Sequence, residues 1–419
     1  MKTVEQRRTS LLAELSEKEG LDLAVISEGI SKNSIVMLAS NISLLKKENF
    51  IPCLIGKKTQ KKIACAIGMT ANDKAHFSAN ELNVILNSKP DYFMDLTVGS
   101  HTIDALKFLR EILDYPLGCA PSYDILAPTN TTSLLSKETI LARLKDIMET
   151  GVDFVCIPMG LNKEMLDSMD TADRLIPITS RTGGLLIEYM RKYQCENPFI
   201  EYLDDVLHML KEYNVVLDLA DIFRPGCTHD AFENKMKSAE LTLQKKISDV
   251  CLERGVGFII EGGGHLSYSN ISKSLEEIHE IFGNVPVWCG SVLGTDRAVG
   301  KDSVANAIGV VKASLAGADA FLSVSNSEHY ARPTYMQTAD SIKDIHIALA
   351  IYRLEIGDPL EKKLNDDMSR ARNALDWQGQ INNSLFPNMT NNLFVEHGLS
   401  NSGKPCTMCG GYCPLLKNH

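Results

Sequence analysis

Three cysteines near the C-terminal end of the chain form the clearest chemical motif. Cys406, Cys409 and Cys413 stand in CTMCGGYC, which has the spacing C-x2-C-x3-C. Three thiolates so spaced can wrap a soft metal centre, and the glycine pair between them allows a tight turn. A structural zinc site normally has four ligands, whereas a 4Fe–4S cluster held by three cysteines keeps one iron open for S-adenosylmethionine (SAM). We therefore predict a 4Fe–4S cluster; the alternative is a zinc knuckle completed by His397 or His419.

Two histidines follow predicted strands in matching positions. Glu261 ends a strand in EGGGHLSY, and His265 lies four residues further on in the loop. His329, in SNSEHYARP, follows the last predicted strand in the same way. Two histidines on one rim of a barrel could share a divalent metal ion and leave positions open for water or substrate. The alternative is a pair of hydrogen-bonded loop residues.

Two turns on the same rim have the composition of anion sites. They are SRTGG (180–184) and DIFRPG (221–226), in which glycine backbone N–H groups stand beside an arginine. That combination suits a phosphate, although ordinary surface turns have the same composition. Asp95 and Tyr123 also lie at or just beyond strand ends and could reach the pocket.

The elements that must position these residues are short apolar runs separated by amphipathic stretches. Eight runs read as strands buried on both faces; they span 61–67, 91–96, 115–120, 153–158, 214–219, 256–261, 285–290 and 319–324. Helical stretches between them include 136–151, 198–213 and 271–283. This alternation predicts parallel pairing and closure into a (β/α)8 TIM barrel of the α/β class. An open doubly wound sheet is the alternative, and the missing G-x-G-x-x-G after the first strand disfavours it.

The ends of the chain predict smaller appendages. Residues 3–19 read as a helix and residues 20–30 as a short strand. We expect an N-terminal domain over 1–60, the catalytic barrel over 61–340, a helical segment over 341–395 and a flexible cluster tail over 396–419. Within that region, 382–404 is rich in Asn and Gly and reads as a looser segment.

Composition limits the class of partner. The 419 residues are 44% hydrophobic, as in ordinary globular proteins, and carry a net charge of −10, which disfavours nucleic acid as the main partner. The N-terminal sequence lacks the apolar core of a signal peptide, and no run of 18 uncharged apolar residues occurs. We therefore expect a cytoplasmic protein without a membrane partner. In that compartment thiols stay reduced, so the other eight cysteines read as small buried hydrophobic residues.

Seven blocks in the same order resemble the ThiC family of radical SAM enzymes, which includes phosphomethylpyrimidine synthases and the anaerobic 5-hydroxybenzimidazole synthases. The resemblance covers nearly the whole chain and preserves the interval of 64 residues between the two histidines. The blocks are MDLTVG (94–99), APSYDIL (120–126), TSRTGG (179–184), DIFRPG (221–226), IIEGGGHLSY (259–268), NSEHYARP (326–333) and CTMCG (406–410).

The resemblance implies a radical rearrangement of 5-aminoimidazole ribotide started from SAM. It implies zinc or a similar divalent ion on His265 and His329, the cluster on the three tail cysteines, and catalytic roles for Glu261 and Asp221. It also implies a reductant protein as electron donor, and a dimer in which the tail of one subunit caps the barrel of another. The residues expected to contact the ribotide are Met94, Tyr123, Ser180, Arg181, Thr182, Asp221, Ile222, Phe223, Arg224, Glu261 and Trp288.

Departures from the family's motifs bear on the product. In ACAIGMT (64–70), Ala64 and Ala66 stand where the family has asparagines, Pro158 replaces a histidine, and Trp288 replaces a pocket tyrosine. Radical rearrangements depend on tight positioning, so we expect a 5-hydroxybenzimidazole synthase for the cobalamin lower ligand, working with a paralogous subunit. The alternatives are a phosphomethylpyrimidine synthase for thiamine, a catalytically silent partner subunit of such a synthase, and a zinc-knuckle binding module on an inert barrel.

Overall fold

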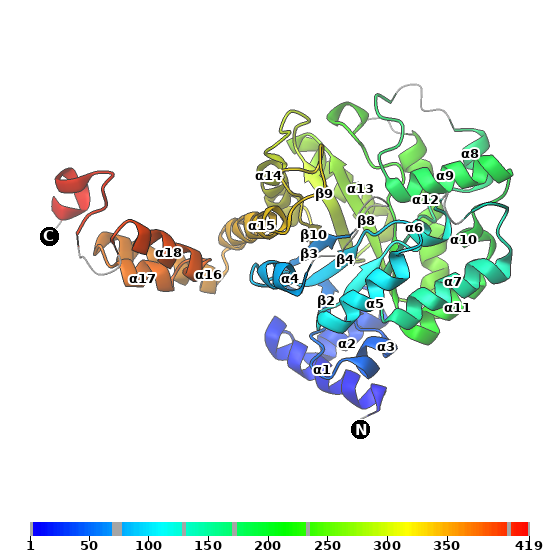
Figure 1. Cartoon of the computed structure of the whole chain (residues 1–419), viewed down its shortest axis with the longest axis horizontal. Coiled ribbons are helices and arrows are strands. Elements are labelled where there is room, and N and C mark those ends of the chain that lie inside the picture. The colour runs from blue at the N-terminus through cyan, green and yellow to red at the C-terminus, as the bar shows by residue number, and fades with distance from the viewer. Residues whose placement is uncertain are drawn as a thin grey trace. The chain divides into compact units, whose positions relative to one another are not determined.

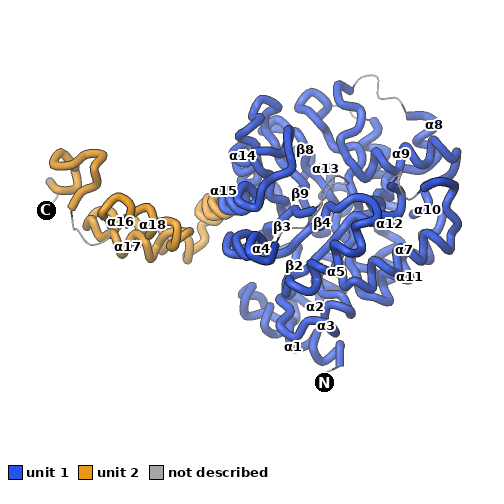
Figure 2. The backbone as a smooth tube through the Cα atoms, in the orientation of Figure 1, with its two compact units in different colours: residues 1–345 blue, residues 346–419 orange. Residues whose placement is uncertain are grey.

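The chain forms two compact units, residues 1–345 and residues 346–419 (Figure 2). The structure is a computed structural model that describes residues 3–68, 78–127, 131–169, 174–231, 235–399 and 404–417. Met69 and Thr70 of the ACAIGMT motif, and His419, lie outside the described residues. Among the described helices, none combines the length and the apolar character that a bilayer-spanning segment needs.

A closed barrel of eight parallel strands forms the centre of the first unit (Figure 1). The strand order around the barrel is β10-β3-β4-β5-β6-β7-β8-β9. Each predicted strand is present, so the barrel prediction is confirmed and the open sheet is excluded. The strands are β3 (Lys62–Ile67), β4 (Tyr92–Asp95), β5 (Leu117–Cys119), β6 (Phe154–Ile157), β7 (Val216–Leu219), β8 (Phe258–His265), β9 (Val287–Leu293) and β10 (Ala320–Leu322).

Aromatic rings fill the barrel near the beginnings of the strands. Tyr92, Phe154 and Trp288 pack edge to face, with ring centroids 5.5 to 6.3 Å apart. Gly118 has no side chain where the Phe154 ring passes, since a Cβ there would lie 2.2 Å from that ring. The hydrophobic core therefore closes this end, and free space is left toward the carboxyl ends of the strands, where TIM barrels carry their sites.

Helices surround the barrel and confirm the predicted amphipathic stretches. The stretch 136–151 is α7 (Lys137–Thr150), which begins after the Ser136 cap and ends at Gly151 in the left-handed conformation. The stretch 198–213 divides into α10 (Pro198–Glu201) and α11 (Leu203–Tyr213), and 271–283 lies in α13 (Tyr268–Phe282). The others are α4 (Ala79–Leu86), α5 (Thr102–Ile112), α6 (Ser122–Ile125), α8 (Lys163–Asp167), α9 (Arg181–Tyr193), η1 (Thr228–Ala231), α12 (Lys235–Arg254) and α14 (Asp302–Leu315).

The N-terminal layer belongs to the same compact unit and gathers at one end of the barrel (Figure 1). It contains α1 (Val4–Glu19), α2 (Leu23–Ser31), β1 (Ile35–Leu38), α3 (Asn41–Lys46) and β2 (Cys53–Gly56), and β1 pairs with β2 antiparallel. The strand predicted over 20–30 is wrong, because these residues form α2. The Asp22 side chain caps that helix by accepting from the Ala24 N–H, and Ile26 is buried in the hydrophobic cluster of the layer. Capping and tertiary packing here outweigh the β-propensity of adjacent valine and isoleucine.

The second unit is helical. It contains the second half of α15 (Tyr335–Glu355), then α16 (Pro359–Asn373), α17 (Trp377–Asn382) and α18 (Pro387–Glu396). The segment 382–404 was expected to be loose, but α18 lies within it. The Trp377 ring packs edge to face on Phe394, and its Nε1 donates to the Lys404 carbonyl at 3.0 Å. These contacts hold the beginning of the cysteine tail to the helices of its own unit.

Candidate functional site

A cavity of about 280 Å³ opens at the carboxyl ends of the barrel strands. Strand ends and the loops that follow them supply its walls, as expected for a TIM barrel. Ten of the predicted site residues line it: Met94, Tyr123, Ser180, Arg181, Thr182, Arg224, Glu261, His265, Trp288 and His329. The structure therefore brings residues from six of the seven sequence blocks, together with Trp288, to one place.

Asp221, Ile222 and Phe223 are absent from the lining of this cavity. The Asp221 carboxylate pairs with Lys237 at 2.7 Å. The backbone N–H groups of Ile222 and Phe223 donate to the Glu240 carboxylate, and both side chains are fully buried. These three residues hold the loop that presents the next residue, Arg224, and their expected contacts with a ligand stay a prediction.

Glu261 and Arg224 form an ion pair at the cavity wall. The Glu261 Oε1 accepts from Arg224 at 2.9 Å, and its Oε2 accepts from the Asp221 backbone N–H at 2.7 Å. Burial raises the pKa of Glu261, and the Arg224 guanidinium partly offsets that effect. The pair fixes the orientation of the carboxylate, so it can accept a hydrogen bond from a ligand N–H or O–H in a defined direction.

The N-terminus of α9 has the features of an anion site in the same cavity. The Ser180 side chain caps the helix by accepting from the Gly183 N–H, and the Arg181 guanidinium lies 5.4 Å from the centroid of the Tyr123 ring. Gly183 is required for close packing, because a Cβ there would lie 2.7 Å from Ile222. Free N–H groups at a helix N-terminus beside arginine side chains suit a phosphate group.

His265 and His329 face each other with their Nε2 atoms 3.3 Å apart. Two nitrogen ligands of a tetrahedral zinc ion, each about 2.0–2.1 Å from the metal, are separated by about 3.3–3.4 Å, so this donor pair fits such an ion. His265 is the last residue of β8 rather than a loop residue as predicted, since the strand continues through the glycines after Glu261. Burial lowers the pKa of His265, which favours the neutral imidazole that a metal requires.

Each histidine is held by a carboxylate that sequence reasoning missed. The Nδ1 of His265 lies 2.8 Å from Asp296, and the Nδ1 of His329 lies 2.8 Å from Asp302. Carboxylates in this position fix the ring orientation of metal-binding histidines and raise their basicity. Both aspartates lie after β9, Asp296 in a loop and Asp302 as the first residue of α14. Their position after a strand was the available signal, but aspartates are too common at such positions for it to identify these two.

Cys156 and Asp218 are two further residues that the sequence did not indicate. Cys156 was interpreted as a buried hydrophobic residue, yet its side chain lines the cavity. Asp218 lies beside it, fully buried, in a strand that otherwise reads as apolar.

Among the substitutions expected to change the pocket, Trp288 lines this cavity, while Ala64, Ala66 and Pro158 are absent from its lining. Ala66 contributes instead to an adjoining pocket shared with Leu96, Arg181 and Glu328.

The tail cysteines lie in a compact turn. The Gly410 N–H donates to the Cys406 carbonyl at 3.0 Å, and the Tyr412 N–H donates to the Cys409 carbonyl at 3.0 Å. Two short 3-10 turns, Gly410–Tyr412 and Pro414–Lys417, flank Cys413. Three thiols on one tight turn are a donor set that fits an iron–sulfur cluster.

Comparison with known proteins shows a family match over the full length. The family "Radical SAM ThiC family" matches residues 1–419. A phosphomethylpyrimidine synthase of Archaeoglobus fulgidus is 29% identical over 411 residues, covering 97% of this chain and 95% of that protein. One from Thermodesulfovibrio yellowstonii is 28% identical, with the same coverage. Among solved structures, a dihydropteroate synthase from Xanthomonas albilineans aligns at 12% identity over 72% of this chain and 94% of its own, with a TM-score of 0.40.

Proposed function

Because the chain belongs to the radical SAM ThiC family, we propose that it is a synthase that rearranges 5-aminoimidazole ribotide in the barrel cavity. Family membership implies SAM and an iron–sulfur cluster, for which Cys406, Cys409 and Cys413 are the proposed ligands. The observation that carries the proposal is the family match over the whole chain together with a cavity that combines an anion site, an oriented carboxylate and a histidine pair.

The residues of the cavity have different proposed roles. Arg181 and the N-terminus of α9 bind the phosphate of the ribotide, and the Arg224–Glu261 pair orients its heterocycle by hydrogen bonding. His265 and His329 hold a zinc or similar divalent ion that polarises a bound oxygen or nitrogen. When bound, the cluster and SAM supply the 5′-deoxyadenosyl radical that starts the reaction.

For the product, we propose a phosphomethylpyrimidine, which makes the chain a synthase of thiamine biosynthesis. The relatives at 28–29% identity carry that name and are matched over nearly their whole length. The expectation of 5-hydroxybenzimidazole synthase has no support from these relatives.

One observation keeps the benzimidazole as a second candidate. Trp288 lines the cavity, and its indole Nε1 has no hydrogen-bond partner among the described residues. An indole where the family has a tyrosine changes the shape of the cavity wall and therefore which ring of a substrate can be held. On this alternative, a paralogous subunit would supply the polar groups that Ala66 and Pro158 lack.

The test is product analysis of anaerobically purified, cluster-reconstituted protein given SAM, a low-potential reductant and 5-aminoimidazole ribotide. We expect a phosphomethylpyrimidine by chromatography and mass, and none from Cys409→Ala, while the buried helix variant Cys251→Ala retains activity. A benzimidazole, alone or with a co-expressed paralogue, would establish the second candidate. Absence of both products under all conditions would assign the chain to a silent partner role.

A further inference from the structure

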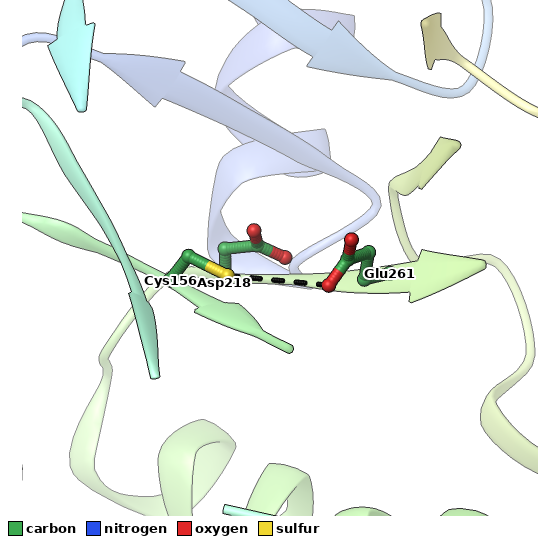
Figure 3. A group of neighbouring side chains, drawn as sticks. All are labelled: Cys156, Asp218 and Glu261. Carbon is green, nitrogen blue, oxygen red and sulfur yellow. Dashed lines mark hydrogen bonds between the residues drawn. The ribbon is translucent and has the colours of Figure 1, made fainter. Parts of the chain in front are cut away.

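Cys156, Asp218 and Glu261 converge inside the barrel from the neighbouring strands β6, β7 and β8 (Figure 3). Cys156 and Asp218 are direct partners in the β6–β7 register. One potential ligand atom from each of the three side chains lies within 4.8 Å of the other two. All three residues are buried.

Asp218 is the member that needs a partner. Its exposed fraction is 0%, and its two carboxylate oxygens receive no hydrogen bond from a nitrogen or hydroxyl group among the described residues. A buried carboxylate without donors is unfavourable, and buried charges in proteins are normally paired or bound to a metal. The adjacent thiol of Cys156 is only a weak donor. The carboxylate therefore faces a position that a cation would fill.

The spacing of the group suits a small divalent ion. The Cys156 Sγ lies 3.9 Å from the Glu261 Oε2. A tetrahedral zinc ion at about 2.3 Å from sulfur and about 2.0–2.2 Å from oxygen separates those two ligands by about 3.6 Å. Three anionic ligands around a divalent ion leave one excess negative charge, and the Arg224 guanidinium, bonded to the other oxygen of Glu261 at 2.9 Å, compensates it.

We propose that Cys156, Asp218 and Glu261 bind a divalent transition metal ion, of the zinc or ferrous class, at the floor of the cavity. The thiolate selects such ions over magnesium or calcium. Cys156 and Glu261 both line the cavity, so a fourth coordination position faces it and can accept a nitrogen or oxygen atom of a bound ligand. This site is separate from the histidine pair and does not depend on which product the protein makes.

Cobalt binding tests the site. The full chain carrying Cys406→Ser, Cys409→Ser and Cys413→Ser is stripped of metal and titrated anaerobically with Co²⁺, so that neither the cluster nor tail thiolates contribute absorption. We expect a thiolate-to-cobalt charge-transfer band whose final intensity corresponds to one thiolate-bound ion per chain. Cobalt on the histidine pair produces no such band.

Variants in the same background identify the ligands. Cys156→Ala removes the band, whereas Cys251→Ala, which removes a buried thiol of α12 whose pKa is raised by burial alone, retains it. Asp218→Asn keeps the thiol and weakens cobalt binding by at least about tenfold, because even the loss of an outer-shell partner costs 10–100-fold in metal affinity.

Three results would each overturn the proposal: no charge-transfer band in the background protein, a band that survives Cys156→Ala, or an Asp218→Asn variant with unchanged affinity. Thermal melting shows whether Cys156→Ala is folded; if it is not, the background titration and Asp218→Asn decide. Because the readout needs neither SAM nor turnover, its failure is distinguishable from failure of the proposed function.

Discussion

Replacing Asp302 by asparagine should weaken zinc binding at the histidine pair without removing a ligand. The Asp302 carboxylate lies 2.8 Å from the His329 Nδ1, on the ring nitrogen opposite the proposed metal. The Asp302 carboxylate favours the His329 tautomer that carries its proton on Nδ1, and it raises the basicity of the His329 Nε2. An asparagine has the same shape but no charge, so it favours this tautomer less strongly and does not raise that basicity. The parallel variant is Asp296→Asn, since Asp296 contacts the His265 Nδ1 at the same distance.

The structure predicts unequal effects for the two variants. Loss of an outer-shell carboxylate typically weakens metal affinity by 10–100-fold, or about 1.4–2.7 kcal/mol. The Asp302 side chain is 3% exposed, whereas that of Asp296 is 36% exposed. Solvent screens the exposed carboxylate more strongly. We therefore expect a loss near 100-fold for Asp302→Asn and near tenfold for Asp296→Asn.

The assay is zinc titration of the metal-free protein against a competing chelator. Zinc bound at the histidine pair is identified as the fraction lost in His329→Ala. Asp249→Asn serves as the control, because Asp249 is an exposed helical aspartate paired only with Lys245 among the described contacts. If both variants bind zinc within about twofold of the parent, far below the 10–100-fold expected for an outer-shell carboxylate, then these residues do not support a metal site and the reasoning fails.

Three further predictions follow from the barrel and the tail. Burial raises the pKa of Asp95 to about 7, so the folded state keeps a proton that the unfolded chain releases near pH 4. As the pH rises from about 4 to about 7, the free energy of unfolding should therefore fall by up to about 1.4 kcal/mol per pH unit. Urea unfolding at pH 5 and pH 8 measures this loss, and Asp95→Asn should abolish it. Gly263 has φ +94°, and a Cβ there would lie 2.2 Å from the Ser291 carbonyl oxygen. Gly263→Ala should therefore lower the free energy of unfolding by more than about 1 kcal/mol and weaken zinc binding. The control Gly294→Ala, whose Cβ would meet open space, should change neither. If the tail of one subunit serves a neighbour's barrel, co-expression of His265→Ala chains with Cys409→Ala chains should restore activity. About half of the dimers then combine one chain of each kind and carry one intact site of two, so we expect about a quarter of the parental activity. No recovery would show that each tail serves the barrel of its own chain.

The barrel was predictable because its strands are buried on both faces. Runs such as FVCI and VLDL leave little choice but an interior position, and each of the eight was located within a few residues. The segment 20–30 failed for a local reason: its valine and isoleucine favour a strand in isolation, but the Asp22 cap and packing of Ile26 decide for a helix.

The site was predictable only where a side chain stands in a distinctive motif. His265 and His329 were found because each follows a predicted strand, although they are 64 residues apart. Cys156 and Asp218 were missed because a single cysteine or aspartate in an apolar run forms no motif with a recognisable spacing. Only the β6–β7 register places them side by side. For Asp221, the motif does not show that its carboxylate pairs with Lys237.

Asp296 connects the loops after β7 and β9 with the end of β8. Besides His265, it accepts hydrogen bonds from the Thr228 N–H at 2.9 Å and the Thr228 hydroxyl at 2.7 Å. Thr228 follows Arg224 on the loop after β7, and the His265 N–H donates to the Pro225 carbonyl of that loop at 2.9 Å. The histidine proposed to bind the metal and the arginine proposed to bind the ligand therefore share one hydrogen-bonded frame.

A shared frame makes the two binding events thermodynamically linked. An ion that orders His265 and Asp296 also orders the loop that presents Arg224, which reduces the entropy that a phosphorylated ligand must overcome to bind there. By reciprocity, the ligand must then tighten the metal by the same factor. The rim thus couples occupancy of one position to occupancy of the other, so each should be retained more strongly in the ternary complex than alone.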